Sequence, residues 1–175
     1  ATVTTGNNAD AYADLESPDG FTEGLDFRAS VTSPGVFAHT YDTSLGALDI
    51  ASQRDAAVTQ LFFTINWLHD AYYDAGFTET AWNAQTDSYG RGGLGGDAIF
   101  AEAQDAAIAG ARNNANMTTF VDGVSPRMQV YLWDGRDTRT LTITSGVGEL
   151  AASTASFGAA EYDVSADIAL AEDAS

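Results

Sequence analysis

Apolar residues recur at helical spacing in the segment between Ser52 and Gly76. Six of them, three or four positions apart, share one face of a predicted helix: Val58, Leu61, Phe62, Ile65, Leu68 and Tyr72. Ser52 with Asp55 three positions later is a variant of the capping box, and Gly76 suits the left-handed conformation that ends many helices. The pattern therefore predicts one long helix over about residues 52–75.

The opposite side of this predicted helix is also partly apolar. Phe63 and Trp67 lie four positions apart on it, where a surface helix ordinarily carries polar side chains. We therefore expect the helix to be covered on two sides, as a central helix or as one at the junction of two lobes.

The rest of the chain is typical of strands and loops. Residues 1–51 are rich in turn-forming Asn, Asp, Gly and Pro, whereas "DAIFAEAQD" (97–105) and "RMQVYLW" (127–133) read as strands. After residue 135 the chain becomes rich in Thr, Ser, Ala and Val, with "TLTIT" and "ADIALA" as further strands. We expect an α+β fold with a boundary near residue 135, and the second part has too few large apolar residues for a core of its own.

The charge of the chain is one-sided. It has 25 acidic residues against 7 basic ones, all arginine, and a formal charge of -18. Such a chain repels nucleic acid and anionic membranes, and no apolar run is long enough for a membrane span. The acidity suits solubility in salt or outside the cell, and it also suits Ca²⁺ or another hard cation. The candidate carboxylates for calcium are unspecific: Asp87, Asp97, Asp105 and Asp122.

Five glycines lie between Gly90 and Gly96, in a loop that invites comparison with phosphate-binding loops. The chain has no lysine, the spacing fits neither nucleotide-binding pattern, and Asp97 would repel phosphate. We interpret the loop as a tight backbone path with several positive-φ positions. We expect Arg91 to pair with a carboxylate across a lobe junction.

No complete active site emerges from the residue types alone. Cysteine is absent, no serine lies in a G-x-S-x-G elbow, and the histidines are His39 and His69. His69 has no histidine or glutamate four positions to either side, so we interpret it as a hydrogen-bonded core histidine.

Four segments nevertheless resemble the fungalysin family of secreted zinc metalloendopeptidases, which are thermolysin-like. They are "RDAAVTQLFFTINWLHDAYYDAGF", "GRGGLGGD", "NNANM" and "RMQVYLW", and the resemblance covers about residues 6–134. It implies an extracellular enzyme that hydrolyses peptide bonds in proteins with Zn²⁺. The family's zinc motif, H-E-x-x-H with a downstream glutamate, does not occur in these 175 residues. The resemblance therefore implies zinc ligands outside this chain, which should be inactive alone.

The resemblance also implies roles for parts of this chain. Residues 1–134 would be the β-rich N-terminal lobe with its central helix, and residues 135–175 the beginning of a protease-associated insert domain. Asn114 would bind substrate backbone through its side chain and Ala115 through its carbonyl, with Asn113 as the weaker neighbour; the structural alternative is an Asn-rich turn. The segment "AAIAGAR" before them is longer than the family's "GSG".

Two partners follow from the resemblance. One is a protein or peptide substrate, and the other is the C-terminal half of the peptidase, in the same precursor or as a second chain. The alternative function is a non-catalytic, acidic extracellular binding module derived from the lobe.

Overall fold

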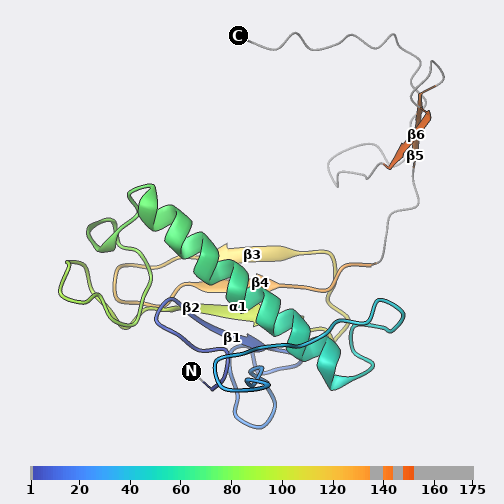
Figure 1. Cartoon of the computed structure of the whole chain (residues 1–175), viewed down its shortest axis with the longest axis horizontal. Coiled ribbons are helices and arrows are strands. Elements are labelled where there is room, and N and C mark those ends of the chain that lie inside the picture. The colour runs from blue at the N-terminus through green and yellow to red at the C-terminus, as the bar shows by residue number, and fades with distance from the viewer. Residues whose placement is uncertain (1, 135–139, 144–147, 152–175) are drawn as a thin grey trace. The chain divides into compact units, whose positions relative to one another are not determined.

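The computed structural model describes residues 2–134, 140–143 and 148–151 (Figure 1). By contacts the chain divides into the units Ala1–Asp134 and Gly135–Ser175. The first contains β1 (Ala9–Ala13), α1 (Ala51–Asp74), the short 3₁₀-helix η1 (Glu79–Ala81), β2 (Ile99–Ala103), β3 (Ala115–Thr118) and β4 (Arg127–Val130). The fold is α+β with one long helix, as predicted.

The second unit contains an antiparallel hairpin. It consists of β5 (Thr140–Ile143), which confirms the strand expected at "TLTIT", and β6 (Gly148–Ala151). The strand expected at "ADIALA" lies outside the described residues. Across the described parts of both units, no helix combines the length and apolarity needed to cross a membrane.

The sheet of the first unit is mixed. Its strand order is β1-β2-β4-β3, with β1, β2 and β4 parallel and β3 antiparallel to β4 at one edge. Helix α1 crosses one face of this sheet diagonally, from the β1 side toward the β3 side (Figure 1). Strand β2 confirms the prediction for 97–105, and β4 is a shorter version of the strand predicted over 127–133.

The core lies between α1 and the two parallel strands β1 and β2. Small side chains on alternate strand positions allow the helix to approach the sheet closely, and Val58 and Ile65 of α1 pack on them. The strand residues of this core are Ala9, Ala11 and Ala13 of β1 and Ala101 and Ala103 of β2. The intervening strand residues, among them Tyr12 and Glu102, therefore face the opposite side of the sheet.

The two ends of α1 differ in how well their sequence signals predicted them. The capping box was wrong: the helix begins at Ala51 after an extended Ile50, without a side-chain cap. Ser52 thus lies inside the first turn and not at the cap position. At the other end Gly76 has φ 102° and its N–H donates to the Tyr73 carbonyl at 2.9 Å, while the Phe77 N–H donates to Tyr72 at 2.9 Å. These two backbone hydrogen bonds form a Schellman motif, which confirms that Gly76 ends the helix as predicted.

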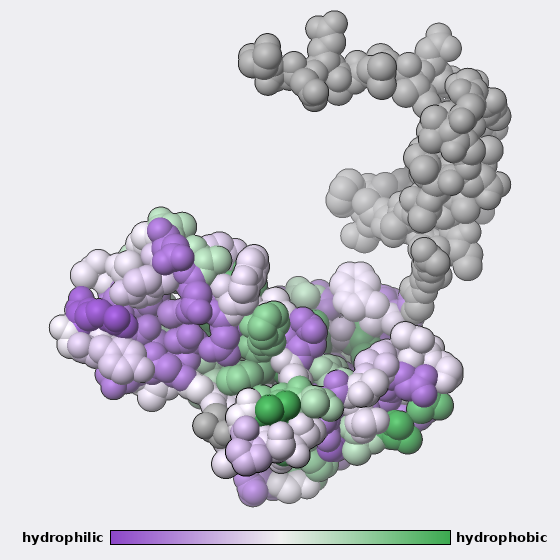
Figure 2. Space-filling view, viewed as in Figure 1, coloured by the Kyte–Doolittle hydropathy of each residue, from purple (hydrophilic) through white to green (hydrophobic). Residues whose placement is uncertain are grey.

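The far side of α1 carries exposed aromatic rings. Phe63 is 63% and Trp67 is 59% exposed. Tyr72, which belongs to the predicted apolar face, is also exposed. Figure 2 shows apolar residues gathered over the middle of α1, while hydrophilic residues dominate the end that carries the loop between α1 and β2. The expected cover on the second side of α1 is not supplied by residues 2–134.

Candidate functional site

The free edge of the sheet is strand β3, whose four residues are all exposed. The Tyr131 N–H donates to the Asn114 carbonyl at 3.2 Å, and Ala115 lies opposite Val130. This register makes Ala115 and Val130 a pair without direct hydrogen bonds between them. The N–H and C=O of Ala115 therefore point away from β4, and those of Met117, two positions on, do the same.

The three residues expected to bind substrate lie together at the start of β3, but they differ in what they contact. Asn113 has φ 60°, and its N–H donates to the Leu132 carbonyl at 2.7 Å. Its side chain donates to the Asp134 carboxylate at 2.6 Å and accepts the Asp134 N–H at 2.8 Å. The Asn113 side chain thus stabilises the local turn, in agreement with the alternative of an Asn-rich turn at this residue.

Asn114 lies at the outer edge. Its Oδ1 accepts the Ala115 N–H at 2.9 Å, which places the side-chain amide beside the outward-facing backbone of β3. Among the described residues no acceptor is found for the Asn114 Nδ2. The Asn114 amide and the Ala115 carbonyl therefore form one exposed polar edge.

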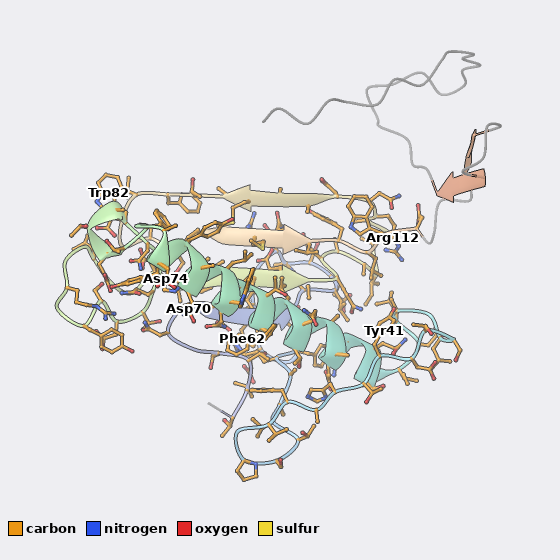
Figure 3. All side chains as sticks on the ribbon, turned by 45° about the horizontal axis from the view of Figure 1, so that its top comes forward. Tyr41, Phe62, Asp70, Asp74, Trp82 and Arg112 are labelled. Carbon is orange, nitrogen blue, oxygen red and sulfur yellow. The ribbon has the colours of Figure 1, made fainter. Side chains whose placement is uncertain are left out.

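An apolar groove of about 520 Å³ lies further along β3, between the C-terminal half of α1 and strands β3 and β4; its lining includes Met117 but neither Asn114 nor Ala115. Figure 3 shows Trp82 at the end of the molecule where α1 terminates and Arg112 at the opposite end. The groove's large apolar lining includes Leu68, Tyr72, Trp82, Met117, Phe120 and Met128. An extended segment along β3 would therefore meet the polar groups at Asn114 and Ala115 first and the apolar surface near Met117 further on.

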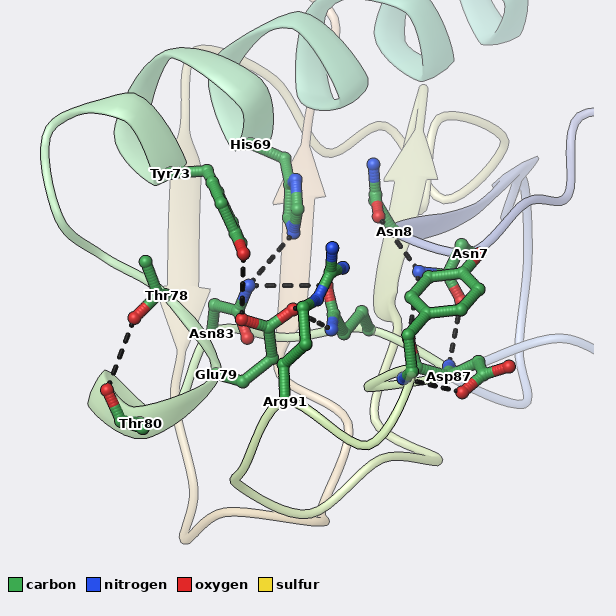
Figure 4. A network of polar contacts seen from close by, with 12 residues as sticks. Asn7, Asn8, His69, Tyr73, Thr78, Glu79, Thr80, Asn83, Asp87 and Arg91 are labelled. Carbon is green, nitrogen blue, oxygen red and sulfur yellow. Dashed lines mark hydrogen bonds and ion pairs between the residues drawn. The ribbon is translucent and has the colours of Figure 1, made fainter.

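A buried glutamate organises the loop between α1 and β2 (Figure 4). Glu79 is 2% exposed and accepts hydrogen bonds from the Tyr73 hydroxyl at 3.0 Å and from the Gln85 amide at 3.0 Å. Arg91 Nε donates to the same carboxylate at 2.8 Å. The expected partner across a lobe junction is thus wrong: Arg91 pairs within its own loop region.

Two glycines explain why this pairing forms. A Cβ at Gly93 would lie 2.3 Å from the Glu79 carbonyl oxygen, and one at Gly95 would lie 2.6 Å from that of Thr86. The Gly-rich loop therefore packs its backbone against that of η1 at Gly93 and against that of Thr86 at Gly95, as only glycine permits. Gly90, Gly92, Gly93 and Gly96 have positive φ, which confirms the predicted tight path.

The electrostatics of Glu79 are those of a permanent anion. Burial opposes its ionisation, but hydrogen bonds from its own N–H, Gln85 and Tyr73, together with the charge of Arg91, lower the pKa of Glu79 to about 2. His69 stacks on Tyr73, and its Nε2 lies 3.4 Å from the Asn83 amide. With 10% of its side chain exposed, His69 is the hydrogen-bonded histidine that we expected.

Three of the four calcium candidates accept hydrogen bonds from backbone N–H groups. Asp97 accepts the N–H groups of Gln85 and Gly123, at 2.9 and 3.0 Å. Asp122 accepts the Leu94 N–H at 2.9 Å, and Asp87 accepts the Tyr89 N–H at 2.7 Å. These carboxylates fix loops and are not gathered at one point.

The fourth candidate, Asp105, belongs to a group of acids on the sheet face opposite α1. In the described part of the chain, Asp14, Asp19, Glu102 and Asp105 are the residues whose ligand atoms gather closely enough for a metal. Sequence reasoning missed Asp14, Asp19 and Glu102; the available signal was an acid within two residues of the end of each of two parallel strands. No histidine belongs to the group, and His39 instead contacts the Ser30 carbonyl at 2.7 Å. The described residues therefore do not fit a zinc site.

Comparison with known proteins gives a consistent result. The model of the fungalysin metallopeptidase family (M36) matches residues 1–166. Extracellular metalloproteinase 5 of Arthroderma otae is 40% identical over 132 residues, which is 75% of this chain and 20% of that protein. Extracellular metalloproteinase MEP of Fusarium vanettenii is 39% identical over 132 residues, again 75% and 20%. The chain thus spans about a fifth of the length of these relatives.

Proposed function

Because the chain belongs to the fungalysin metallopeptidase family (M36), we propose that it is part of a secreted, extracellular zinc endopeptidase that hydrolyses peptide bonds in proteins. Residues 1–134 are its β-rich N-terminal lobe, and residues 135–175 begin a protease-associated insert domain. The relatives' names, extracellular metalloproteinases, support the activity and the location. The zinc ligands lie on the part of the protease beyond this chain, since the described residues do not fit that ion.

The single observation that carries a role for this lobe is the outward-facing backbone of β3. A peptide in extended conformation adds to such an edge by pairing its own N–H and C=O groups with those of the strand. On β3 the Ala115 carbonyl and the Asn114 amide are the groups offered first, and Met117 offers the next pair. The groove that begins near Met117 receives apolar side chains further along the same peptide.

The remainder of the protease is the second partner. Packing of the C-terminal half against the exposed rings of Phe63 and Trp67 removes apolar surface from water. The half is connected in the same precursor or associates as a second chain, and without it the present chain is inactive. A purified 175-residue chain that bound stoichiometric zinc and cleaved casein would contradict this proposal.

Kinetics of the full-length protease test the edge. Asn114→Ala removes one hydrogen-bonding amide from the cleft, so KM for a peptide substrate should rise about tenfold with the zinc content unchanged. Asn116→Ala is the matched control, because Asn116 lies in β3 two positions further on. Equal kinetics for Asn114→Ala and the wild type would remove this residue from the cleft.

A further inference from the structure

The parallel strands β1 and β2 end side by side, and acidic side chains near these ends lie on the face of the sheet that α1 does not cover. Ala13 of β1 is paired with Ala103 of β2, so Asp14, which follows β1 directly, and Asp105, two residues beyond β2, lie at the same edge. Glu102 points to this face from within β2, and Asp19 reaches it from the loop after β1. The fold itself therefore concentrates four carboxylates at one point.

The spacing of these groups suits a single cation. One ligand oxygen from each of Asp14, Asp19, Glu102 and Asp105 lies within 4.8 Å of all the others. Calcium binds oxygens at about 2.3–2.6 Å, so ligands on opposite sides of one ion are about 5 Å apart. All four carboxylates can therefore touch the same Ca²⁺.

Two carboxylate oxygens of the cluster are buried without a hydrogen-bond donor. Glu102 is fully buried, and its Oε1 accepts the Tyr12 hydroxyl at 3.0 Å while its Oε2 receives no hydrogen bond from the described residues. Asp105 is 4% exposed, and its Oδ2 is likewise without a donor there. Buried acceptors of this kind are costly unless something satisfies them.

One basic side chain faces the cluster in the described part of the molecule. Arg127 forms an ion pair with Asp19, and its Nε lies 4.0 Å from Glu102 Oε2. Gln129 donates a further hydrogen bond to Asp19 at 3.0 Å. Arg127 and Gln129 thus contact mainly Asp19, and one positive charge faces four carboxylates. Glu102 Oε2 and Asp105 Oδ2 still receive no hydrogen bond from the described residues.

We propose that Asp14, Asp19, Glu102 and Asp105 form a Ca²⁺ site that ties the ends of β1 and β2 to the loop after β1. A cavity of about 250 Å³, lined by Asp19, Asp105, Gln129 and Tyr131 among others, connects the cluster with solvent and admits the ion. Flexible coordination by six to eight oxygens favours Ca²⁺ over Mg²⁺, which demands a tight octahedron. This site does not depend on the proposed peptidase function.

Burial also shifts the pKa values of the acids in this cluster. Burial raises the pKa of Glu102 to about 7 and that of Asp14 to about 6, and it also raises the pKa of Asp105. The other titratable groups facing these acids are Tyr12, Asp19, Asp26, Tyr131 and Arg127.

Thermal unfolding of the 175-residue chain, with CaCl₂ or with EDTA, tests the site. At a hundredfold excess over Kd, Ca²⁺ should raise Tm by roughly 10 °C, and MgCl₂ should raise it far less. Calorimetric titration should give one Ca²⁺ per chain. Glu102→Gln and Asp105→Asn should abolish both effects, whereas Asp70→Asn, which removes the same charge from the exposed surface of α1, should retain them.

The same variants keep the test decisive if a substitution alters folding. In EDTA, Glu102→Gln and Asp105→Asn should be at least as stable as the wild type, because each relieves repulsion between buried acids. A wild-type Tm that ignores Ca²⁺, or a Ca²⁺ effect that survives in both variants, would overturn the proposal. Lower stability of both variants in EDTA, without any Ca²⁺ response of the wild type, would show a purely structural network.

Discussion

Glu79 and Glu102 are both buried carboxylates, but the fold surrounds them with different numbers of hydrogen-bond donors. Glu79 has a donor on each side, from Tyr73, Gln85 and Arg91, and its pKa is lowered to about 2. Glu102 has one hydroxyl donor and a distant guanidinium, and burial raises its pKa to about 7. Burial alone thus does not determine the charge state; the donors that the fold supplies do.

This contrast separates a structural acid from a binding acid. A carboxylate that the protein satisfies by itself holds elements together, as Glu79 joins α1, η1 and the Gly-rich loop. Carboxylates that the protein gathers without satisfying are suited to an external cation. The candidates chosen from the sequence for calcium include both kinds: each oxygen of Asp97 accepts a backbone N–H, whereas Asp105 Oδ2 receives no hydrogen bond from the described residues.

The largest effect is expected from breaking the Glu79 site through the backbone. Gly93→Ala places a Cβ against the Glu79 carbonyl at a left-handed residue, so the loop must move and Arg91 loses its partner. We expect a loss of about 3 kcal/mol in the free energy of unfolding. The matched control is Gly90→Ala, also at positive φ but with open space around it, which should cost about 1 kcal/mol. Equal losses in urea unfolding would show that the close approach is unimportant.

Amide substitutions should then act in opposite directions at the two sites. Glu79→Gln turns an amide toward Arg91 and removes the charge that its donors stabilise, so Tm should fall by roughly 5 °C. Glu102→Gln removes a charge that the fold does not stabilise, so Tm in EDTA should stay equal or rise. Differential scanning calorimetry of both variants measures the two changes in Tm. A similar fall in Tm for both would contradict the distinction between the two carboxylates.

A smaller effect is expected in the pH dependence of stability. The pKa of Glu102 rises from its ordinary value of 4.5 to about 7, so the folded state binds more protons than the unfolded state between these values. Stability in EDTA should therefore fall as the pH rises from 4.5 through 7. For Glu79, whose folded pKa is about 2, stability should instead be lost as the pH falls from 4.5 through 2.

Calcium sharpens this prediction. Saturating Ca²⁺ replaces the protons of the cluster, so the decline between pH 4.5 and 7 should disappear while the acid limb governed by Glu79 remains. Tm measured in EDTA and in CaCl₂ at half-unit pH steps gives both limbs. A decline that persists with Ca²⁺ present would assign it to other groups.

Sequence reasoning found the features that depend on neighbours along the chain. The spacing of apolar residues and Gly76 gave α1 to within a residue, although Ser52 does not cap it because the chain stays extended only as far as Ile50. The acid cluster depends on parallel pairing between strands far apart in the chain, as in the bond from Tyr12 to Glu102 across 90 residues. Acids near the ends of two strands were visible in the sequence, but no local pattern shows that these strands pair, so the cluster was not predicted.

The candidate substrate edge was named through the family resemblance and not through periodicity. The structure adds what the sequence could not provide, namely the direction of each backbone group. Asn113 is engaged by Asp134, while the Ala115 carbonyl points outward because of the register of β3 with β4. That register depends on long-range pairing, and the substrate role of these residues stays a prediction.

The most direct test of the account is a crystal structure of the full-length protease with a substrate-like peptide bound. We predict an extended peptide paired with β3, with the Ala115 carbonyl accepting a peptide N–H and the Asn114 amide donating to a peptide carbonyl. The C-terminal half should cover Phe63 and Trp67. A peptide bound elsewhere, or a β3 edge occupied by the protein itself, would contradict the assignment of this lobe as the substrate-binding edge.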